Sequence, residues 1–515
     1  MRPLAETFRA YRWAATTDEV AALAGIGPEE VLRFDQNTSP LPLRSARPGT
    51  IAKPLANISG YPAGGYRRLR RAIADYAGVE PANVVLGAGA DDLILLCARA
   101  YAGPGDRVAT PAAPTYPLYK IATELAGATV YDADTEGPAP VLTFDCRPNN
   151  PTGDVRPLPG ARPLVVDEAY IEYGGESAVG LLDDGVIVIR TFSKLFALAG
   201  ARIGYALAAA DVAAELNARQ APAPVSTLSA ELAIAALADR PDVTPVLEER
   251  DRLAKGLREL GLDPLPSETN FLYVPVDDGP ALAQALMRRG LVVRSYPEAI
   301  RASVRDAEDD DVLLDALAEI LDRPAPTTDR ASGRRVRHAR ATAETRINVR
   351  LGLDGSSRVL VSTGAGLYDH LLEQLAFHAG FDLIIEGAGD LETGDHHTAE
   401  DTALAFGEAL DAALGDRRGI RRYGDAVVPM DDALARAAVD LGGRPFAELS
   451  ISPDPGLSDH VLQSLSQAGR LAIHVEATGR EAHHTAEAAF KAVGRALRQA
   501  VQVDGDVLPS TKGLL

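Results

Sequence analysis

The feature that most constrains this chain of 515 residues is a motif that occurs twice in its last third. The sequence His-His-Thr-Ala-Glu stands at 396–400 and again at 483–487, and an Asp-His step precedes each copy, at 369–370 and at 459–460. Because the elements follow in the same order both times, we predict an α+β domain made of two duplicated half-units.

Carboxylate and imidazole side chains in this repeat have the spacing of metal ligands. Residues three and four apart share one face of a helix, so Glu400 lies on the side of His396 and His397, and the second copy repeats this spacing. Adjacent helical residues diverge by about 100°, so the two histidines of a pair do not suit one ion. We therefore predict two metal ions, each with three imidazoles and one carboxylate that cross between half-units or between subunits. The candidate ligands are His370, His396, His397, Glu400, His460, His483, His484 and Glu487.

A simpler interpretation is that these histidines are solvated residues at helix starts, or core histidines paired with carboxylates. One His-His pair would be explained in this way, but two copies in register with two matching Asp-His steps are not. The ligand set contains no thiolate, which favours Mn, Fe or Zn over softer metals. His338, His378 and His474 lack the pattern, and we expect them to be structural or linker residues.

The first three fifths of the chain have a different pattern. From about Asp18 to Leu321, short apolar runs such as 107–110, 164–166 and 186–189 alternate with helical stretches, which predicts βα units around a largely parallel sheet. The segment from Asp322 to Arg340 is rich in Pro, Thr and Arg and has no hydrophobic period, as in a linker. We therefore predict one domain over 1–321, a linker over 322–338 and a second domain over 339–515.

The first domain contains an ordered set of residues that suits an aldehyde cofactor with a phosphate group. Lys194 follows a buried strand, with Ser193 before it and Arg202 eight residues after it, which suits a Schiff-base lysine flanked by phosphate ligands. Asp167 ends another strand and can pair with a protonated pyridine nitrogen. Asn150 lies at a turn and can supply an amide to a phenolic oxygen. The residues Gly89, Ala90 and Asp91 precede a helix whose free N–H groups can take the phosphate.

In this order, these residues resemble those of the fold-type-I aminotransferases, over about residues 20–321, and especially the histidinol-phosphate aminotransferase branch. The resemblance implies pyridoxal phosphate (PLP) as the cofactor and a large α/β domain with a small C-terminal subdomain. It also implies roles for further residues: Tyr116 against the cofactor ring, Asn150 and the catalytic Tyr170 at its oxygen, Tyr61 reaching across a dimer interface, Arg301 for the carboxylate of the amino donor, and Arg294 as a second anion contact.

From about Arg335 to Leu515, the chain resembles imidazoleglycerol-phosphate dehydratase. The match includes the histidine repeat and the segments 419–425, 439–445 and 509–513. It implies two Mn²⁺ ions in a large cage of many subunits, with active sites shared between neighbours. It further implies Glu344 as the acid/base, Gln374 at the substrate, and a phosphate site of Arg422, Arg444, Lys491, Ser510 and Lys512. Several basic side chains are what a dianionic phosphate requires.

The two resemblances imply consecutive reactions. The dehydratase converts imidazole glycerol phosphate to imidazole acetol phosphate, which histidinol-phosphate aminotransferase converts to histidinol phosphate with glutamate as the amino donor. We therefore predict a bifunctional enzyme of histidine biosynthesis. Two alternatives stay open: an aminotransferase for an aromatic or phospho-amino-acid substrate, or one half that has lost catalysis and organises the oligomer.

Composition limits the partners. A net charge of -20 argues against nucleic acid and anionic membranes, and no stretch reaches about 18 uninterrupted apolar residues. Two cysteines do not make a disulfide framework, so we expect a reducing, cytoplasmic location. The two family resemblances imply a homo-oligomer, with the aminotransferase as a dimer, that acts on small molecules.

Overall fold

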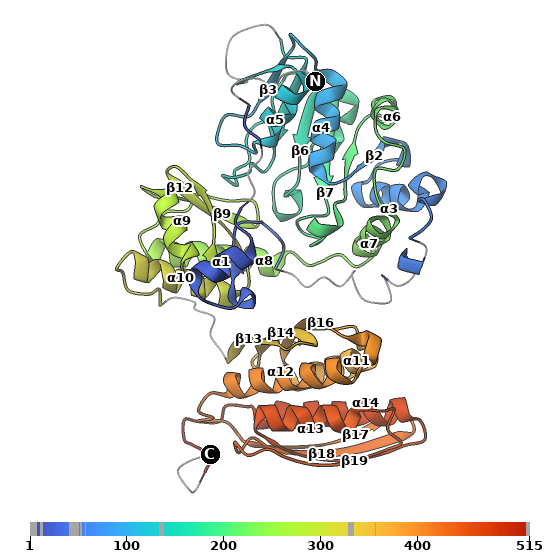
Figure 1. Ribbon diagram of the computed structural model, residues 1–515, viewed down its shortest axis with the longest axis vertical. Coiled ribbons are helices and arrows are strands. Elements are labelled where there is room, and N and C mark those ends of the chain that lie inside the picture. Colours follow the sequence, from blue (N-terminus) through green and yellow to red (C-terminus); the bar gives the residue numbers. More distant parts are fainter. Residues whose placement is uncertain are drawn as a thin grey trace. The chain divides into compact units, whose positions relative to one another are not determined.

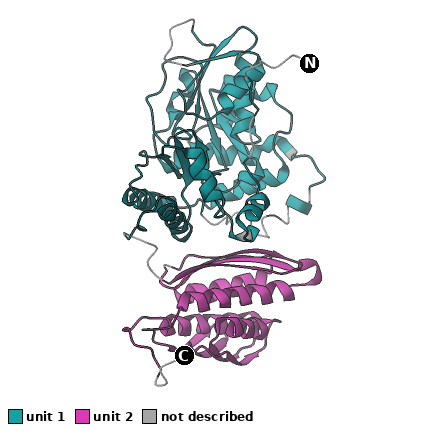
Figure 2. Ribbon diagram, turned by 60° about the vertical axis from the view of Figure 1, so that its left-hand side comes forward, with its two compact units in different colours: residues 1–330 teal, residues 331–515 magenta. Residues whose placement is uncertain are grey.

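The computed structural model describes residues 8–10, 14–40, 51, 54–56, 58–132, 139–327, 334–355 and 357–510. The chain forms two compact units, Met1–Arg330 and Ala331–Leu515 (Figure 2). Strand β13 (Arg335–Ala341) starts inside the segment that we predicted to be a linker. Its side chains are half-buried or exposed at an edge of its sheet, so it lacks the hydrophobic period of a strand. Among the described residues, no helix is long and apolar enough to span a membrane.

The first unit is built around a sheet of seven strands in the order β2-β8-β7-β6-β5-β3-β4. Its strands are β2 (Val84–Gly87), β3 (Arg107–Thr110), β4 (Thr129–Asp132), β5 (Leu142–Cys146), β6 (Leu164–Asp167), β7 (Val186–Thr191) and β8 (Gly204–Leu207). Strand β8 is antiparallel to its two neighbours, and the remaining pairs are parallel. The predicted mostly parallel α/β sheet is thus confirmed.

Both faces of this sheet are buried, which explains why its strands are continuous apolar runs. Along β6, Val165 packs into one hydrophobic cluster and Val166 into another, as the alternation of a strand requires. The helices of this part are α3 (Arg67–Ala77), α4 (Ala90–Tyr101), α5 (Leu118–Ala126), α6 (Ala210–Arg219), α7 (Thr227–Ala238) and α8 (Thr244–Glu259) (Figure 1).

A small subdomain follows in the chain, as predicted. It contains the antiparallel sheet β11-β12-β9, with β9 (Phe271–Pro275), β11 (Arg294–Tyr296), β12 (Ala299–Ser303), α9 (Gly279–Met287) and α10 (Ala307–Ile320). The N-terminal segment joins it: α1 (Thr17–Ala24) precedes β1 (Leu32–Arg33), which pairs in parallel with β10 (Leu291–Val292). The N–H of Ser303 donates to the carbonyl of Phe34 at 2.8 Å, so residues 34–37 run beside the end of β12.

The second unit consists of two half-units with one topology. The first contains β13, β14 (Thr345–Gly352), β15 (Val359–Ser362), α11 (Gly366–Ala379), β16 (Asp382–Gly389) and α12 (His396–Leu414). The second contains β17 (Tyr423–Met430), β18 (Ala433–Asp440), β19 (Phe446–Ser452), α13 (Ser458–Gly469), β20 (Ala472–Thr478) and α14 (Ala482–Ala500). The sheet orders are β13-β14-β16-β15 and β17-β18-β20-β19, with only the last pair of each parallel. The structure therefore shows the duplication that the repeat predicted.

The four helices of this unit lie in two layers between its two sheets (Figure 1). Helix α11 packs against α14 and α12 against α13, so each contact joins helices of different half-units. The backbones come very close, because a Cβ at Gly494 would lie 2.3 Å from the carbonyl oxygen of Leu375. This pairing brings the Asp-His step of one half-unit to the His-His motif of the other.

Candidate functional sites

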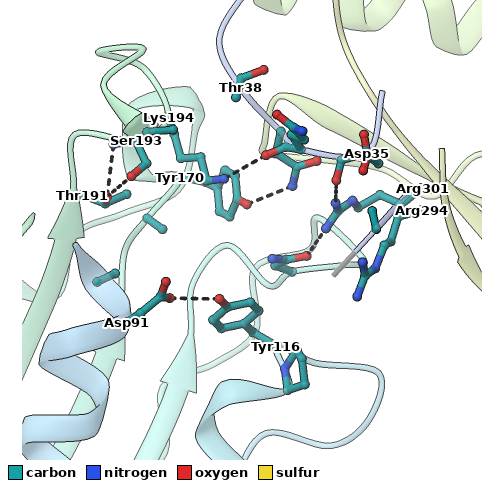
Figure 3. A pocket seen from close by; sticks show the side chains of 18 of the residues that line it. Asp35, Thr38, Asp91, Tyr116, Tyr170, Thr191, Ser193, Lys194, Arg294 and Arg301 are labelled. Carbon is teal, nitrogen blue, oxygen red and sulfur yellow. Dashed lines mark hydrogen bonds between the residues drawn. The ribbon is translucent and has the colours of Figure 1, made fainter. Parts of the chain in front are cut away.

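The first unit contains a cavity of about 730 Å³ between its large sheet and its small subdomain (Figure 3). The predicted residues that line it are Ala90, Asp91, Tyr116, Asn150, Asp167, Tyr170, Ser193, Lys194, Arg202, Arg294 and Arg301. Those from positions 90 to 202 meet because strands of the large sheet end at the same edge, and Arg294 and Arg301 come from the small subdomain. Motifs that are far apart in the sequence therefore lie together in one cavity.

Lys194 projects into the cavity from the turn after β7. Its Nζ donates to the carbonyl of Gln36 at 3.2 Å and lies 5.5 Å from the centre of the Tyr170 ring. Burial and the guanidinium of Arg301 lower the pKa of Lys194 to about 8, although the carboxylates of Asp91 and Asp167 oppose this shift. The uncharged amine that a nucleophile requires is therefore more populated at neutral pH than for an exposed lysine.

Asp167 lies at the carboxyl end of β6, and protein groups hold both of its oxygens. The hydroxyl of Tyr119 donates to Oδ2 at 2.8 Å, and the N–H of Ala169 donates to Oδ1 at 3.1 Å. Burial raises the pKa of Asp167 to about 6, although these two hydrogen bonds oppose the shift. Sequence reasoning missed Tyr119, since nothing in an apolar helix start distinguishes it from a core aromatic residue.

Polar and basic groups gather around the start of α4. Asp91 accepts hydrogen bonds from the hydroxyl of Tyr116 at 2.9 Å and from Arg202 at 3.0 Å. Gly89 is the N-cap of α4, and a Cβ at this position would lie 3.0 Å from Nη2 of Arg202. The free N–H groups of the helix, Ser193 and Arg202 form a cradle that fits a phosphate group.

Two arginines face the cavity from the small subdomain. Arg294 and Arg301 stand directly opposite each other on β11 and β12, an arrangement that is unfavourable for like charges without an anion. Arg301 donates to Oδ1 of Asn150 at 2.6 Å and to the carbonyl of Asp35 at 2.7 Å, but its buried Nε has no hydrogen-bond partner among the described residues. This part of the cavity therefore suits an anionic group of the substrate.

The segment 33–37 contributes contacts to the cavity that sequence reasoning did not specify. The amide of Asn37 donates to the hydroxyl of Tyr170 at 2.9 Å, and Arg33 makes a two-point ion pair with Asp35 at the edge of the cavity. Tyr61 does not line the cavity and is 92% exposed. Its expected contact with a second subunit stays a prediction.

The second unit gathers six of the eight candidate metal ligands into two groups. One group is His370, His483 and Glu487, and the other is His396, Glu400 and His460, with ligand atoms within 4.8 Å of one another. Each group takes one histidine from an Asp-His step and a histidine and a glutamate from the other half-unit's motif. The ligands therefore cross between half-units, which was one of the two possibilities left open.

In both groups the Nε2 atoms converge on the carboxylate. Nε2 of His370 and of His483 lie 2.7 and 3.1 Å from Oε1 of Glu487. Nε2 of His396 and of His460 lie 3.5 and 3.3 Å from Oε2 of Glu400. Imidazole nitrogens with one carboxylate form a donor set that fits Mn, Fe or Zn.

The other two histidines, His397 and His484, stand apart from these two groups, and His397 instead forms a third possible ligand group with Glu344 and Asp390. Nδ1 of His397 lies 3.1 Å from Asp390, and Nδ1 of His484 lies 2.7 Å from Asp432. The expected set of three imidazoles and one carboxylate is therefore not complete within the described part of one chain, where each of the first two groups holds two imidazoles. Adjacent positions on a helix diverge, so the second histidine of each motif points elsewhere.

The predicted substrate residues of this unit do not form a group as close as the metal ligands do. Arg422 makes a two-point ion pair with Asp440, and Lys491 donates to Glu487 at 2.5 Å. Glu344 is exposed, with Oε2 3.5 Å from Nδ1 of His397. Of the remaining candidates, Gln374 is half-buried on α11, Arg444 is exposed before β19, Ser510 ends the described chain, and Lys512 lies outside the described residues.

Comparison with known proteins gives separate matches for the two units. The family model "Aminotransferase class I and II" matches residues 32–317. A solved histidinol-phosphate aminotransferase from Sinorhizobium meliloti, in complex with pyridoxal-5'-phosphate, is 26% identical with a TM-score of 0.53, covering 61% of this chain and 96% of that chain. A putative histidinol-phosphate aminotransferase from Erwinia carotovora atroseptica is 24% identical with a TM-score of 0.52 and covers 60% and 98%, which supports the fold.

The family model "Imidazoleglycerol-phosphate dehydratase" matches residues 363–497. An imidazoleglycerol-phosphate dehydratase from Salinispora tropica is 49% identical over 201 residues, which cover 35% of this chain and 99% of that protein. Another from Ruegeria pomeroyi is 50% identical over 194 residues, covering 35% and 100%. Almost the full length of these relatives is thus covered by about a third of this chain, and the family model lies within the second unit.

Proposed function

We propose that this chain, which belongs to the class I and II aminotransferase family in its first unit and to the imidazoleglycerol-phosphate dehydratase family in its second, is a bifunctional enzyme that catalyses two consecutive steps of histidine biosynthesis. The second unit dehydrates imidazole glycerol phosphate to imidazole acetol phosphate. The first unit transfers the amino group of glutamate to that product. The observation that carries the proposal is that one chain contains both a complete Lys194 cavity and a duplicated set of metal ligands.

In the aminotransferase unit, different residues around the cavity have different roles in the reaction. Bound PLP supplies an electron sink for the reacting carbon. Nζ of Lys194, with its lowered pKa, takes and returns a proton at that carbon. The carboxylate of Asp167 keeps the pyridine nitrogen protonated, and Arg301 and Arg294 bind the carboxylate of the amino donor or the phosphate of the keto substrate.

In the dehydratase unit, the difficulty is to remove a proton from carbon with no neighbouring carbonyl group. The groups around Glu487 and Glu400 would each hold a divalent ion, which would supply the electron withdrawal that this proton removal needs. We assign the proton transfer to Glu344, which is exposed and lies beside His397. We assign the substrate phosphate to Arg422, Arg444, Lys491, Ser510 and Lys512, with Gln374 beside the substrate.

Mn²⁺ is the proposed metal, and we propose a dimer for the aminotransferase and a cage of many subunits for the dehydratase. Cys97 and Cys146 are both free and buried, which supports a reducing compartment such as the cytoplasm. Metal analysis of the purified protein tests the first point, and the mass of the intact assembly tests the second.

The deciding experiment supplies the purified chain with imidazole glycerol phosphate, with and without glutamate. Imidazole acetol phosphate is expected to accumulate without glutamate, and histidinol phosphate is expected when glutamate is present. An aromatic keto acid and a keto acid phosphate serve as competing acceptors. If amine transfer occurred only to one of these, the aminotransferase would have another specificity.

Two variants separate the halves in the same experiment. Lys194→Ala is expected to stop only the transfer, and His396→Ala only the dehydration. If either variant left its own step unchanged, the role assigned to that residue would be wrong, whereas a step that the natural chain itself failed to catalyse would mark that half as catalytically silent. The presence of Lys194, Asp167, Arg202 and both ligand groups favours two active halves over a silent one.

A further inference from the structure

The two histidines outside the ligand groups share one feature that the sequence did not reveal. Each has its Nδ1 against a carboxylate of its own half-unit: Asp390 at 3.1 Å from His397, and Asp432 at 2.7 Å from His484. Asp390 follows β16, and Asp432 lies between β17 and β18, so the two acids come from different places in the half-units. The same local geometry therefore arises twice from non-equivalent positions.

A neutral imidazole that donates from Nδ1 has a lone pair on Nε2. Nε2 is also the atom with which the other four histidines face their carboxylates. The side chains of His397 and His484 are 41% and 30% exposed, so they are accessible to another molecule. Each ligand group in turn holds only two imidazoles, fewer than the three that we expected for each metal.

We propose that Asp390 and Asp432 are positioning residues that hold His397 and His484 with Nε2 unprotonated, so that each histidine can bind a metal ion at the sites shared between subunits that the family resemblance implies. This inference rests on the proposed metal-dependent dehydratase function. Hydrogen bonds of this kind fix the tautomer and the orientation of metal-binding histidines elsewhere in proteins. Other acids near these rings are Glu344, 3.5 Å from Nδ1 of His397, and Asp431, 3.6 Å from Nε2 of His484.

Asp432 offers the sharper test, because its two carboxylate oxygens have different hydrogen-bond partners. Oδ2 accepts the N–H groups of Arg480 at 2.5 Å and of Glu481 at 3.0 Å, just before α14, and Oδ1 faces His484. Asp432→Asn replaces one carboxylate oxygen with an NH₂ group. If the remaining oxygen still accepts the two backbone N–H groups, the NH₂ group must point at Nδ1 of His484. That ring must then accept at Nδ1 and carry its proton on Nε2, where it no longer binds a metal ion.

The experiment titrates Mn²⁺ into the full-length protein and measures the ions bound per chain, together with thermal unfolding of the metal-free protein. We expect two ions per chain in the natural protein and about one in Asp432→Asn, with at least ~10-fold weaker binding at the affected site. His484→Ala should lose the same ion, and the double variant should lose no more, because both changes act on one ligand. The unfolding temperature of the metal-free variant should be unchanged.

Asp425→Asn is the matched control, since it removes an exposed carboxylate from β17 and should leave both ions bound. The inference is overturned if Asp432→Asn binds two ions as tightly as the natural protein. It is also overturned if the variant loses metal only together with a lower unfolding temperature, which would indicate a structural role. Absence of Mn²⁺ from the natural protein would instead contradict the proposed dehydratase function, so the two failures are distinguishable.

Discussion

The two units reach their chemistry in different ways. In the first, residues from several strand ends meet in one cavity, and buried partners such as Tyr119 hold the key acid in place. In the second, ligands lie near helix starts, and each group of three is matched by one histidine that faces away. The described residues of the first cavity thus meet within one chain, whereas the ligand groups of the second unit hold fewer imidazoles than expected, and we propose that they are completed by another copy of the chain.

The largest effect is expected for Lys194→Ala. Without this amine, the proton at the reacting carbon has no acceptor, so transamination should fall by about 10³-fold or more. The visible absorbance of bound PLP should also change. Both are measured on the full chain, with dehydration of imidazole glycerol phosphate followed in parallel.

Dehydration should stay within a factor of about two in this variant, because Lys194 belongs to the other unit. A parallel loss of dehydration would contradict the view that the two units carry independent sites, since it would mean that the two sites depend on each other. Lys255→Ala, at a distant position on α8, is the matched control.

The next effect is expected for His396→Ala. This change leaves one group with His460 and Glu400 only, so metal affinity at that site should fall by at least ~100-fold. Dehydration should fall with the metal content, while transamination is unaffected. Elemental analysis and the two activity assays measure this. Retention of two ions per chain would contradict the assignment of His396 as a ligand.

The same contrast explains what could be predicted from the sequence. The fold of both units followed from apolar runs and from the repeat, because burial on both faces of a sheet and duplication leave a pattern in the chain. The residues of the cavity followed from motif order. The partner of Asp167 did not, since Tyr119 is brought to it only by packing. Likewise, helical spacing predicted the ligands but not their grouping, which depends on how α11 packs against α14 and α12 against α13.

A smaller effect concerns the stability of the first unit. The pKa of Asp167 is about 6 in the folded protein, above its ordinary value of 3.8, because the site is buried. The folded state therefore holds this proton more tightly, and the resulting stability is present below about pH 4 and is lost as the pH rises through 6. Asp167→Asn does not titrate, so above pH 6 the PLP-free variant should be more stable than the natural protein, by on the order of 1–3 kcal/mol.

Urea unfolding of the PLP-free chain at pH 5 and pH 8 measures this difference, using the transition that shifts when PLP is added. The advantage of the variant should be larger at pH 8 than at pH 5, and transamination should be severely reduced. A pH-independent difference would show that Asp167 is not a buried titrating group.

The smallest effect on stability and metal content is expected for His338→Gln. This variant tests whether histidines outside the repeat take part in metal binding. His338 lies on β13 with Nε2 2.8 Å from Glu408, and both side chains are about one third exposed. Such pairs contribute little, so the free energy of unfolding should fall by less than about 1 kcal/mol, and the Mn²⁺ content should not change. His378→Gln, in the last turn of α11, is a matched control with the same expectation. If either substitution removed a metal ion, the ligand set would extend beyond the repeat, and the two half-units would not by themselves account for the metal chemistry of the second unit.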